Sequence, residues 1–386
     1  MAFLQNSRPA SPTFAAASNR LTIDLGALAD NWRRMGALSG RARAAAVLKA
    51  NAYGIGLKPA AEALYAAGAR DFFVANAEEG AALRPVVPDG KIYILAGLWP
   101  GNEQLFFDNA LIPIVNSKEQ LDLFLSVLPQ RGEHPFALHV DTGMNRLGLG
   151  ATEALALAGD AASPAGSSPV LVMSHLACAD DPGHPLNRRQ LESFQTVAAA
   201  FKGVESSLAN SAGVHLGSDY HFDLTRPGIA VYGGEAVNDM PNPMKPVVTA
   251  QARILQIRSV RTGETASYGA SAQFARDSRV AIVAIGYADG YHRSVSGGGV
   301  TLRQATPSGA FGFLNGHKIP HLGRVTMDLS LFDVTDLPED AARPGDYVEL
   351  FGENIAIDDV ARAGGTIGYE MLTSLGERYE RAYIES

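Results

Sequence analysis

One lysine, Lys49, follows directly on a short apolar run in the sequence AVLKANAYGIG. The run (44–48) is typical of a buried parallel strand, and the two glycines after Tyr53 allow a tight turn. Partial burial lowers the pKa of a lysine, so more of it is the neutral amine that attacks an aldehyde. Tyr53 could hold a phosphate oxygen beside it. A solvated lysine at a strand end is the simpler alternative for a lone lysine.

Other polar residues also stand at or near the ends of short apolar runs. They are Asn76, Asn116, Asp141, His175, Asn210 and Tyr232. In a parallel barrel, catalytic residues lie at the carboxyl ends of the strands. A polar residue there is often a helix cap instead, and we expect a cap where Asn116 and Ser117 precede the helical run KEQLDLFL.

The elements that must position these residues alternate between strand and helix. A first short strand (21–25) precedes a helix that Asp24 or Gly26 could cap. Strands are then predicted at 45–49, 72–76, 92–97, 112–116, 136–141, 170–175, 206–210 and 229–232, with helices such as 59–67, 78–84, 117–128 and 187–201 between them. Eight such repeats predict an α/β fold, a closed (β/α)8 TIM barrel over residues 20–241. An open doubly wound sheet is the alternative, although no GxGxxG motif opens a first helix.

The pattern changes after residue 241. The sequence NDMPNPMKP predicts a linker, and residues 247–260 alternate apolar with polar before a hairpin turn at 261–264. Further strands are predicted at 280–285, 299–302, 325–333 and 347–350, and short helices at 357–363 and 371–383. We therefore expect a C-terminal all-β domain (242–386), and residues 1–19 as a flexible tail without signal-peptide features.

Composition limits the partners. The 386-residue chain carries a net charge of −8, which argues against nucleic acid and anionic membranes. The only cysteine is Cys178, so no intrachain disulfide can form, as fits a cytoplasmic protein. No apolar run reaches the roughly 18 residues of a membrane span, and no metal site is predicted.

Three further motifs carry groups for an anionic ligand. In HVDTGMNRLGLG, Arg146 offers a planar fork for a carboxylate or phenolate oxygen, although an exposed loop arginine is the simpler interpretation. In LANSAG, the Ser211 hydroxyl suits a phosphate or a helix cap. In DLTRPGIAVYGG, the backbone N–H groups of Gly228 and Ile229 could complete a phosphate cradle.

Together these motifs resemble those of the alanine racemases. AVLKANAYGIG resembles their pyridoxal-phosphate (PLP) lysine motif, DTGMNRLG matches their DTGM-x-R-LG motif, and ordered matches extend from residue 21 to residue 380. The resemblance implies a cofactor linked to Lys49, with Arg226 at the pyridine nitrogen, His175 beside the ring and Arg146 facing the ring oxygen and the substrate carboxylate. The remaining implied cofactor contacts are Tyr53, Asn210, Ser211, Gly228, Ile229 and Tyr369.

One position departs from the family. Two residues before Asp141 the family commonly has a lysine, described as carbamylated and bonded to the arginine of this motif; here the residue is His139. Histidine cannot form that stable carbamate. A neutral imidazole, a protonated imidazole or a bound anion must orient Arg146 instead, and the sequence leaves the three open.

The arginine at the pyridine nitrogen implies a reaction type. Many PLP enzymes place a carboxylate there, which keeps the nitrogen protonated and makes the ring a strong electron sink. A charged Arg226 disfavours that protonation, which weakens the sink and limits side reactions. That logic favours proton exchange at Cα.

Racemisation needs a base on each face of the planar carbanion. The resemblance implies that Lys49 serves one face and that Tyr268, in ASYGASAQF, serves the other from the partner subunit of a homodimer. An unperturbed tyrosine titrates near pH ~10, so Tyr268 needs a network such as that of His175 and Arg226. The resemblance also implies that Tyr287 and Met327 line the substrate site. It assigns an entrance corridor to Asp180, Arg293, Arg324 and Ile367, together with Tyr268 and Tyr369.

The sequence thus predicts an isomerase that interconverts L-alanine and D-alanine through a PLP aldimine by a two-base mechanism, supplying D-alanine for peptidoglycan. The alternatives are a basic amino-acid decarboxylase of the same architecture, a broad-specificity or serine racemase, and a non-catalytic PLP carrier. Arg226 and Tyr268 disfavour the decarboxylase, and the β domain disfavours the carrier. The sequence does not distinguish a biosynthetic from a catabolic isozyme.

Overall fold

The structure, a computed structural model, describes residues 12–159, 169–296 and 309–386. The chain forms two compact units, which are described separately. The barrel unit comprises Leu28–Val231 and Glu235–Met244, and the β unit comprises Met1–Ala27, Tyr232–Gly234 and Lys245–Ser386. The predicted strand at 299–302 lies outside the described residues.

Parallel strands form the centre of the barrel unit. They are β2 (Arg43–Ala44), β3 (Ala46–Val47), β4 (Asp71–Val74), β5 (Lys91–Ile94), β6 (Leu111–Val115), β7 (Ala137–Asp141), β8 (Leu149–Gly150), β9 (Leu171–Met173), β10 (Glu205–Ser207) and β11 (Leu224–Thr225). The main sheet runs β10-β9-β7-β6-β5-β4-β3, and β11 pairs with β2. An Asn210–Arg226 bridge links the β10 and β11 segments. The ring of parallel strands is therefore closed, as the TIM-barrel prediction requires.

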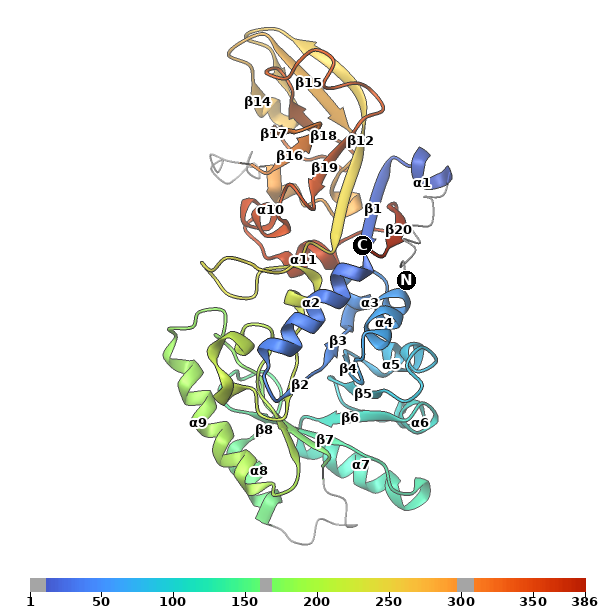
Figure 1. Cartoon of the computed structure of the whole chain (residues 1–386), viewed down its shortest axis with the longest axis vertical. Helices are drawn as coiled ribbons and strands as arrows, with labels where there is room; N and C mark the ends of the chain where they lie inside the picture. Colours follow the sequence, from blue (N-terminus) through green and yellow to red (C-terminus); the bar gives the residue numbers. More distant parts are fainter. Residues whose placement is uncertain (1–11, 160–168, 297–308) are drawn as a thin grey trace, which may run out of the picture. The chain divides into compact units, whose positions relative to one another are not determined.

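Helices follow the strands along their outer side, as Figure 1 shows for α4 to α7. The helices of this unit are α2 (Leu25–Leu38), α3 (Lys49–Tyr53), α4 (Leu57–Ala66), α5 (Ala77–Leu83), α6 (Glu103–Asp108), α7 (Lys118–Arg131), α8 (Ala151–Gly159) and α9 (Pro185–Ala200). Side chains cap the N-termini of two of these helices: Asp24 accepts from Ala27 N at 2.9 Å at the start of α2, and Asn76 accepts from Glu79 N at 2.9 Å at the start of α5. Such caps satisfy N–H groups that have no partner inside the helix.

The eighth strand differs from the prediction. Residues 229–232 form a 3₁₀ turn, η3 (Ile229–Tyr232), and the strand that closes the ring is β11, five residues earlier. The Ser211 hydroxyl accepts from the backbone N–H groups of Gly228 and Ala230, so this apolar segment curls around that hydroxyl instead of pairing with a strand. Two more 3₁₀ turns precede it, η1 (Gly213–Leu216) and η2 (Ser218–Tyr220).

The β unit is built on a mainly antiparallel sheet that closes on itself. Its strands are β1 (Asn19–Asp24), β12 (Val248–Val260), β13 (Thr265–Ala266), β14 (Ala272–Gln273), β15 (Ser278–Val283), β16 (Phe311–Leu314), β17 (His317–Leu322), β18 (Ser330–Asp333), β19 (Tyr347–Phe351) and β20 (Glu380–Ile384). The order is β15-β18-β17-β16-β19-β12-β1-β20, with β15 also paired to β12. The long β12 makes this closure possible, because its residues 250–253 pair with β19 and its residues 254–260 pair with β15, with a register shift between Ile254 and Gln256. The all-β prediction for this part of the chain is confirmed.

Both chain ends of this unit differ from the prediction. The first strand, β1, pairs with β12 and β20 instead of entering the barrel, and α1 (Pro12–Ala16) precedes it within the predicted tail. The helix predicted at 371–383 is only α11 (Gly368–Thr373), after which the chain forms β20. This last strand pairs with the edge of β1. No local pattern in the sequence reveals a pairing over so long a distance. The preceding helix, α10 (Ile357–Ala363), is as predicted.

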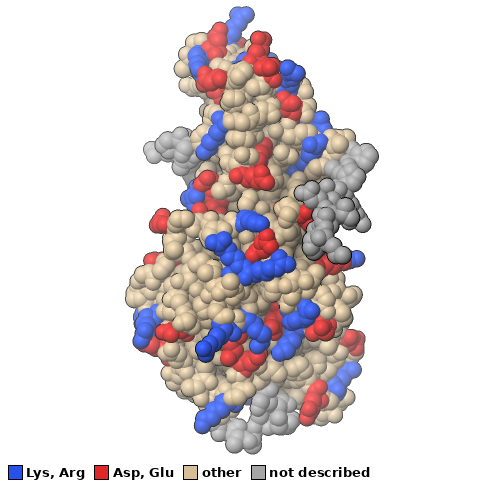
Figure 2. Space-filling model, viewed as in Figure 1, with Lys and Arg blue, Asp and Glu red and all other residues tan. Residues whose placement is uncertain are grey.

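The surface carries both signs of charge. In Figure 2, acidic and basic side chains are interspersed over the viewed face of each unit, without one large field of a single sign. Within the described residues, no helix is both long and apolar enough to cross a membrane.

Candidate active site

Lys49 lies at the carboxyl end of β3, where the barrel prediction placed it. Four residues that follow it, Ala50 to Tyr53, all have φ between 52° and 56°. A left-handed conformation costs roughly 1–2 kcal/mol for each residue with a Cβ, and strain of this kind concentrates at functional sites. Burial lowers the pKa of Lys49, the positive charge of Arg146 lowers it further, and Glu79 opposes both. More of Lys49 is therefore the neutral, nucleophilic amine than in an exposed lysine.

Arg146 lies on an exposed loop whose course is fixed by its own residues. Asp141, at the end of β7, accepts hydrogen bonds from Gly143 N at 2.8 Å and Met144 N at 2.9 Å. A side chain at Gly148 would place its Cβ 2.6 Å from Asp141 N, so the loop needs glycine there. The loop holds Arg146 close enough to influence the charge of Lys49, His139 and His175.

The imidazole of His139 is buried and neutral. Its Nδ1 lies 2.8 Å from Asn116 Oδ1. Burial, with the nearby charges of Arg226 and Arg146, lowers the pKa of His139 to about 4. Of the two protonation states left open by the sequence, the structure therefore supports the uncharged one. The expected cap at Asn116-Ser117 is provided by Ser117, which accepts from Gln120 N, while Asn116 bonds to His139.

Arg226 is buried among acceptors. Its guanidinium donates to the Ser207 hydroxyl and to the backbone oxygens of Ser174 and Leu208. Burial lowers the pKa of Arg226 to about 9, so the group still carries its charge at pH 7. One of its nitrogens lies 3.5 Å from Nδ1 of His175. Since arginine can only donate, Nδ1 of His175 is the acceptor, and burial beside Arg226 holds the pKa of His175 well below its usual value.

The turn after Arg226 presents backbone N–H groups to a single hydroxyl. Ser211 Oγ accepts from Gly228 N at 2.7 Å and from Ala230 N at 3.4 Å. A Cβ at position 228 would lie 2.3 Å from the Tyr53 hydroxyl, so only glycine lets Tyr53 close over this turn. Ile229 begins the 3₁₀ turn beside them. Asn210 acts as a local cap, because its Oδ1 accepts from Gly213 N at 2.9 Å.

The structure thus brings together the barrel residues predicted to hold the cofactor. The nearby charges of Arg226 and Arg146 lower the pKa values of His139 and His175, and the charge of Arg146 also lowers the pKa of Lys49. Arg146 and Arg226 supply positive charge, Lys49 supplies an amine of lowered pKa, and the two histidines are kept neutral. Such a cluster suits a ligand with several anionic groups, and the hydroxyl-and-glycine turn suits a phosphate.

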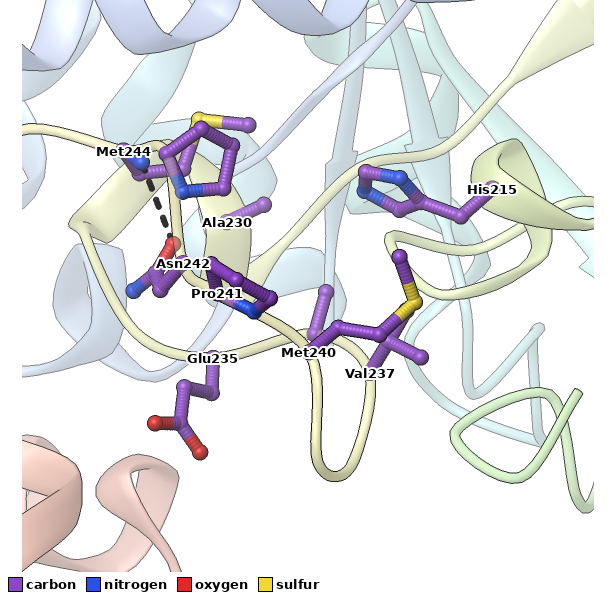
Figure 3. Close-up of a pocket in the computed structure, with 10 residues that line it drawn as sticks. His215, Ala230, Glu235, Val237, Met240, Pro241, Asn242 and Met244 are labelled. Carbon is purple, nitrogen blue, oxygen red and sulfur yellow. Dashed lines mark hydrogen bonds between the residues drawn. The ribbon is translucent and has the colours of Figure 1, made fainter.

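A separate small cavity lies in the barrel unit. It has a volume of about 20 Å³, room for about one water molecule. Figure 3 shows Met240 extending towards His215, while the Glu235 carboxylate points away and Asn242 accepts from Met244 N. Ala230 is its link to the turn after Arg226, but none of the predicted cofactor residues lines it. It is too small to hold a cofactor.

The predicted residues of the β unit lie in loops and short helical elements, and several of their side chains are exposed. Tyr268 begins η4 (Tyr268–Ala270) between β13 and β14, and its side chain is 67% exposed. Its neighbours Ser267 and Ala270 both have positive φ. Ser267 Oγ bonds to both the backbone N–H and the carbonyl of Arg324, which fixes this turn against the loop that carries Arg324.

The same loop reaches the other predicted substrate residues. Tyr287 N donates to Thr326 O at 3.0 Å and Ala288 N donates to Met327 O at 3.1 Å, so η5 (Tyr287–Asp289) packs on the Met327 loop. Arg293, in η6 (Arg293–Ser296), donates to Val325 O at 3.3 Å. Five large predicted side chains of the β unit are exposed; they are Tyr268, Tyr287, Met327, Ile367 and Tyr369. An exposed apolar set of this kind is typical of a surface that meets a partner or a ligand.

The family is shown by two models that cover most of the chain. The model described as the alanine racemase N-terminal domain matches residues 23–236, and the model of the C-terminal domain matches residues 247–383. The chain belongs to the alanine racemase family. Pyridoxal phosphate is the cofactor of this family, and the main functional prediction is supported over the decarboxylase alternative.

Relatives with this name match nearly the whole chain. The alanine racemase of Rhizobium meliloti is 75% identical over 97% of this chain and 99% of its own length. The biosynthetic alanine racemase of Agrobacterium fabrum is 61% identical over 96% of this chain and 95% of its own length. Among solved structures, the alanine racemase of Bartonella henselae, which carries covalently bound pyridoxal phosphate, has a TM-score of 0.87 at 37% identity and covers 95% of this chain and 100% of its own.

Sequence reasoning missed two side chains of this alanine racemase site. Asn116 was expected only as part of a cap, and Glu79 was not singled out. Glu79 bonds to the turn that follows Lys49, and Asn116 bonds to His139. A signal for Glu79 was present, because a glutamate in the first turn of a helix that follows a barrel strand lies near the strand ends.

Proposed function

We propose that this protein interconverts L-alanine and D-alanine with pyridoxal phosphate linked to Lys49. The observation that carries the proposal is the lysine itself: its pKa is lowered by burial and by Arg146 at the carboxyl end of a barrel strand. The turn behind it is left-handed from Ala50 to Tyr53, and strain of this kind concentrates at functional sites.

The residues present fit the cofactor. Tyr53, Ser211, Gly228 and Ile229 would hold the phosphate, where the glycine leaves room for the tyrosine hydroxyl. Asn210 shapes the adjoining turn, and the family resemblance assigns Tyr369 to the same set. Arg226 would face the pyridine nitrogen, and neutral His175 would lie beside the ring. When bound, pyridoxal phosphate supplies an aldehyde for the lysine and a ring that withdraws electrons from Cα.

Two bases would exchange the α-proton. Lys49 would hold or release the proton on one face, and Tyr268 on the other. Arg146 would bind the substrate carboxylate, while Tyr287 and Met327 would limit the side chain to a small one. Asp180, Arg293, Arg324 and Ile367 would line the approach. We also propose that Tyr268 is contributed by the partner subunit of a homodimer, which is supported by its exposure and by the other exposed large side chains of the same unit.

Replacing the lysine tests the proposal. Lys49→Ala should lower racemisation of both alanine enantiomers by about 10⁴-fold or more, since the variant loses the nucleophile and one base. Lys58→Ala is the matched control, because that side chain is 75% exposed on α4 and its amine lies 3.9 Å from Glu62. Near-normal turnover by the Lys49 variant, with no cofactor trapped on Lys49 by borohydride in the unchanged protein, would refute the function.

Mixing two inactive variants tests the shared site. If Lys49 and Tyr268 of one site come from different subunits, dimers of a Lys49→Ala chain with a Tyr268→Phe chain contain one intact site. Activity should return when the two proteins are denatured together and refolded, but not when either is refolded alone. Failure of the mixture, although both variants form dimers, would place both residues in one subunit.

Substrate range and role in the cell rest on further comparisons. The chain is 61% identical to the biosynthetic racemase of Agrobacterium fabrum and 41% identical to the catabolic one of the same organism. We therefore propose a biosynthetic, cytoplasmic enzyme that supplies D-alanine for peptidoglycan. A D-alanine requirement on deletion of the gene would support this role.

Serine turnover comparable to alanine turnover would indicate a broad-specificity racemase, and CO₂ release from lysine, ornithine or arginine would indicate the decarboxylase.

A further inference from the structure

The carboxylate of Glu79 joins two strand ends at the predicted cofactor site. Its Oε1 accepts from Asn51 N at 3.2 Å, and its Oε2 accepts from Ala75 N at 2.8 Å. Asn51 lies two residues after Lys49, and Ala75 directly follows β4. One side chain of α5 therefore ties the turn behind Lys49 to the end of the neighbouring strand.

The turn that Glu79 holds needs such support. Ala50, Asn51, Ala52 and Tyr53 are all left-handed, and three of these four residues, the two alanines and the tyrosine, do not adopt that conformation readily. Hydrogen bonds within the turn, such as Ala52 N to Leu48 O at 2.8 Å, do not link it to the rest of the barrel. Glu79 supplies a link from outside, with a charged acceptor that is stronger than a neutral one.

Glu79 is itself fixed in direction. Its backbone N–H donates to the Asn76 side chain, which begins α5, and the side chain is partly buried beneath the strand ends. Its neighbour Glu78 also lies in the first turn of α5 but is exposed. The two adjacent glutamates therefore differ in contact and not in charge, which provides a matched control.

We propose that Glu79 is a positioning residue for Lys49: its carboxylate holds the left-handed turn against β4 and so fixes the direction of the amine. This inference rests on the proposed role of Lys49. Glu79 also opposes the other charges around that amine. Arg146, from the loop after β7, lowers the pKa of Lys49, while Glu79 raises it; His175, at the end of β9, is neutral.

Glu79→Gln and Glu79→Asp separate the carboxylate's charge from its reach. Glutamine keeps the length but loses the charge and one acceptor oxygen, and aspartate keeps the charge but is too short to reach both N–H groups. In hydrogen exchange read by mass spectrometry, peptides containing Asn51 or Ala75 should exchange about tenfold or more faster in both variants. Glu78→Gln should leave this exchange unchanged.

The second readout is the pH dependence with which the cofactor-free protein takes up pyridoxal phosphate, followed by its absorbance and by borohydride trapping. Without the negative charge of Glu79, the pKa of Lys49 falls further, so the midpoint for uptake should move to lower pH in Glu79→Gln. It should stay near its original place in Glu79→Asp and Glu78→Gln. Loss of stability alone would not move this midpoint.

The outcomes distinguish the two proposals. If Glu79→Gln and Glu78→Gln show the same exchange and the same midpoint as the unchanged protein, Glu79 does not position Lys49. If borohydride traps no cofactor on Lys49 in the unchanged protein, the proposed function fails, and the exchange experiment alone still shows whether Glu79 holds the turn.

Discussion

The side-chain amide of Asn116 determines which nitrogen of His139 carries the proton. Asn116 Nδ2 donates to the backbone oxygens of Leu95 at 3.1 Å and Ile114 at 2.8 Å, so Oδ1 is the acceptor that faces His139 Nδ1 at 2.8 Å. Nδ1 of His139 is therefore the donor, and Nε2 of the neutral ring is left as an acceptor. Where the family's usual lysine is described as carrying a carbamate, this chain has a neutral acceptor fixed by an amide.

Asn116→Asp should favour the protonated form of His139. A carboxylate facing Nδ1 stabilises the imidazolium, so the pKa of His139 should rise from about 4. A charged His139 would repel Arg146 and Arg226, and we expect racemisation to fall on the order of tenfold, or ~1.4 kcal/mol. Nitrogen NMR of labelled histidine should show the Nδ1–H tautomer without titration between about pH 5 and 8 in the unchanged protein, and titration in the variant.

Ser117→Asp is the control for that charge. It adds the same carboxylate one residue later, where aspartate caps α7 as well as serine does. Equal effects of both substitutions on the His139 titration would mean that general charge, and not the contact with Asn116, determines the protonation of His139.

Tyr268→Phe should affect the two substrate enantiomers unequally. If Tyr268 is the base for one face, the variant should remove the α-proton of L-alanine about 10²–10⁴-fold more slowly, while exchange from D-alanine into deuterated water is affected less. The separate exchange rates of the two enantiomers measure this. Tyr383→Phe, at a half-exposed position on β20, is the control. Equal slowing of both exchanges would contradict the two-base proposal.

Much of the barrel site could be predicted because its residues follow a simple rule. Lys49, Asp141 and His175 end or follow buried apolar runs, and parallel strands bring such ends together. The contacts that complete the site follow no such rule. Glu79 reaches the Lys49 turn from a helix 28 residues away, and Asn116 reaches His139 across 23 residues.

The elements of the fold that were predicted wrongly also depend on contacts between residues that are far apart in the sequence. The apolar segment Ile229–Tyr232 has strand composition, but the Ser211 hydroxyl turns the backbone before it can pair. β20 has the length and polarity of a helix end, but the edge of β1, some 360 residues earlier, makes it a strand. The left-handed turn after Lys49 was also unpredictable, because alanine and tyrosine do not favour that conformation locally.

Gly228→Ala should weaken cofactor binding through Tyr53. The new Cβ would lie 2.3 Å from the Tyr53 hydroxyl, so the tyrosine must move away from the phosphate turn. Loss of one hydrogen bond to a charged group costs about 1.5–3 kcal/mol, which is roughly 10- to 150-fold in the dissociation constant for pyridoxal phosphate. Titration of the cofactor-free protein by fluorescence measures it.

Tyr53→Phe serves as the partner substitution. It removes the hydroxyl that the added methyl group would meet, so Gly228→Ala in a Tyr53→Phe background should cost less additional affinity than Gly228→Ala alone. Two fully additive effects would show that Gly228 acts independently of Tyr53.

Acid should destabilise the protein through its buried neutral histidines. In the β unit, both ring nitrogens of His321 are buried, and neither has a hydrogen-bond partner among the described residues. Burial lowers the pKa of His321 to about 4, as it does for His139. Between the ordinary pKa of about 6.5 and about 4, the unfolded chain binds the proton and the folded one does not. Stability is therefore complete above about pH 6.5 and decreases as the pH falls towards 4.

His321→Phe isolates one part of this effect. The ring of His321 packs against Phe332, with centroids 5.2 Å apart, so an apolar ring suits the position. The variant should be at least as stable as the unchanged protein at pH 7, because it buries no unpaired nitrogen. On acidification to pH 4 it should lose less stability, by on the order of 3 kcal/mol. Urea unfolding of both proteins across this range measures the difference, and parallel loss of stability in the two would show that His321 does not remain neutral in the folded state.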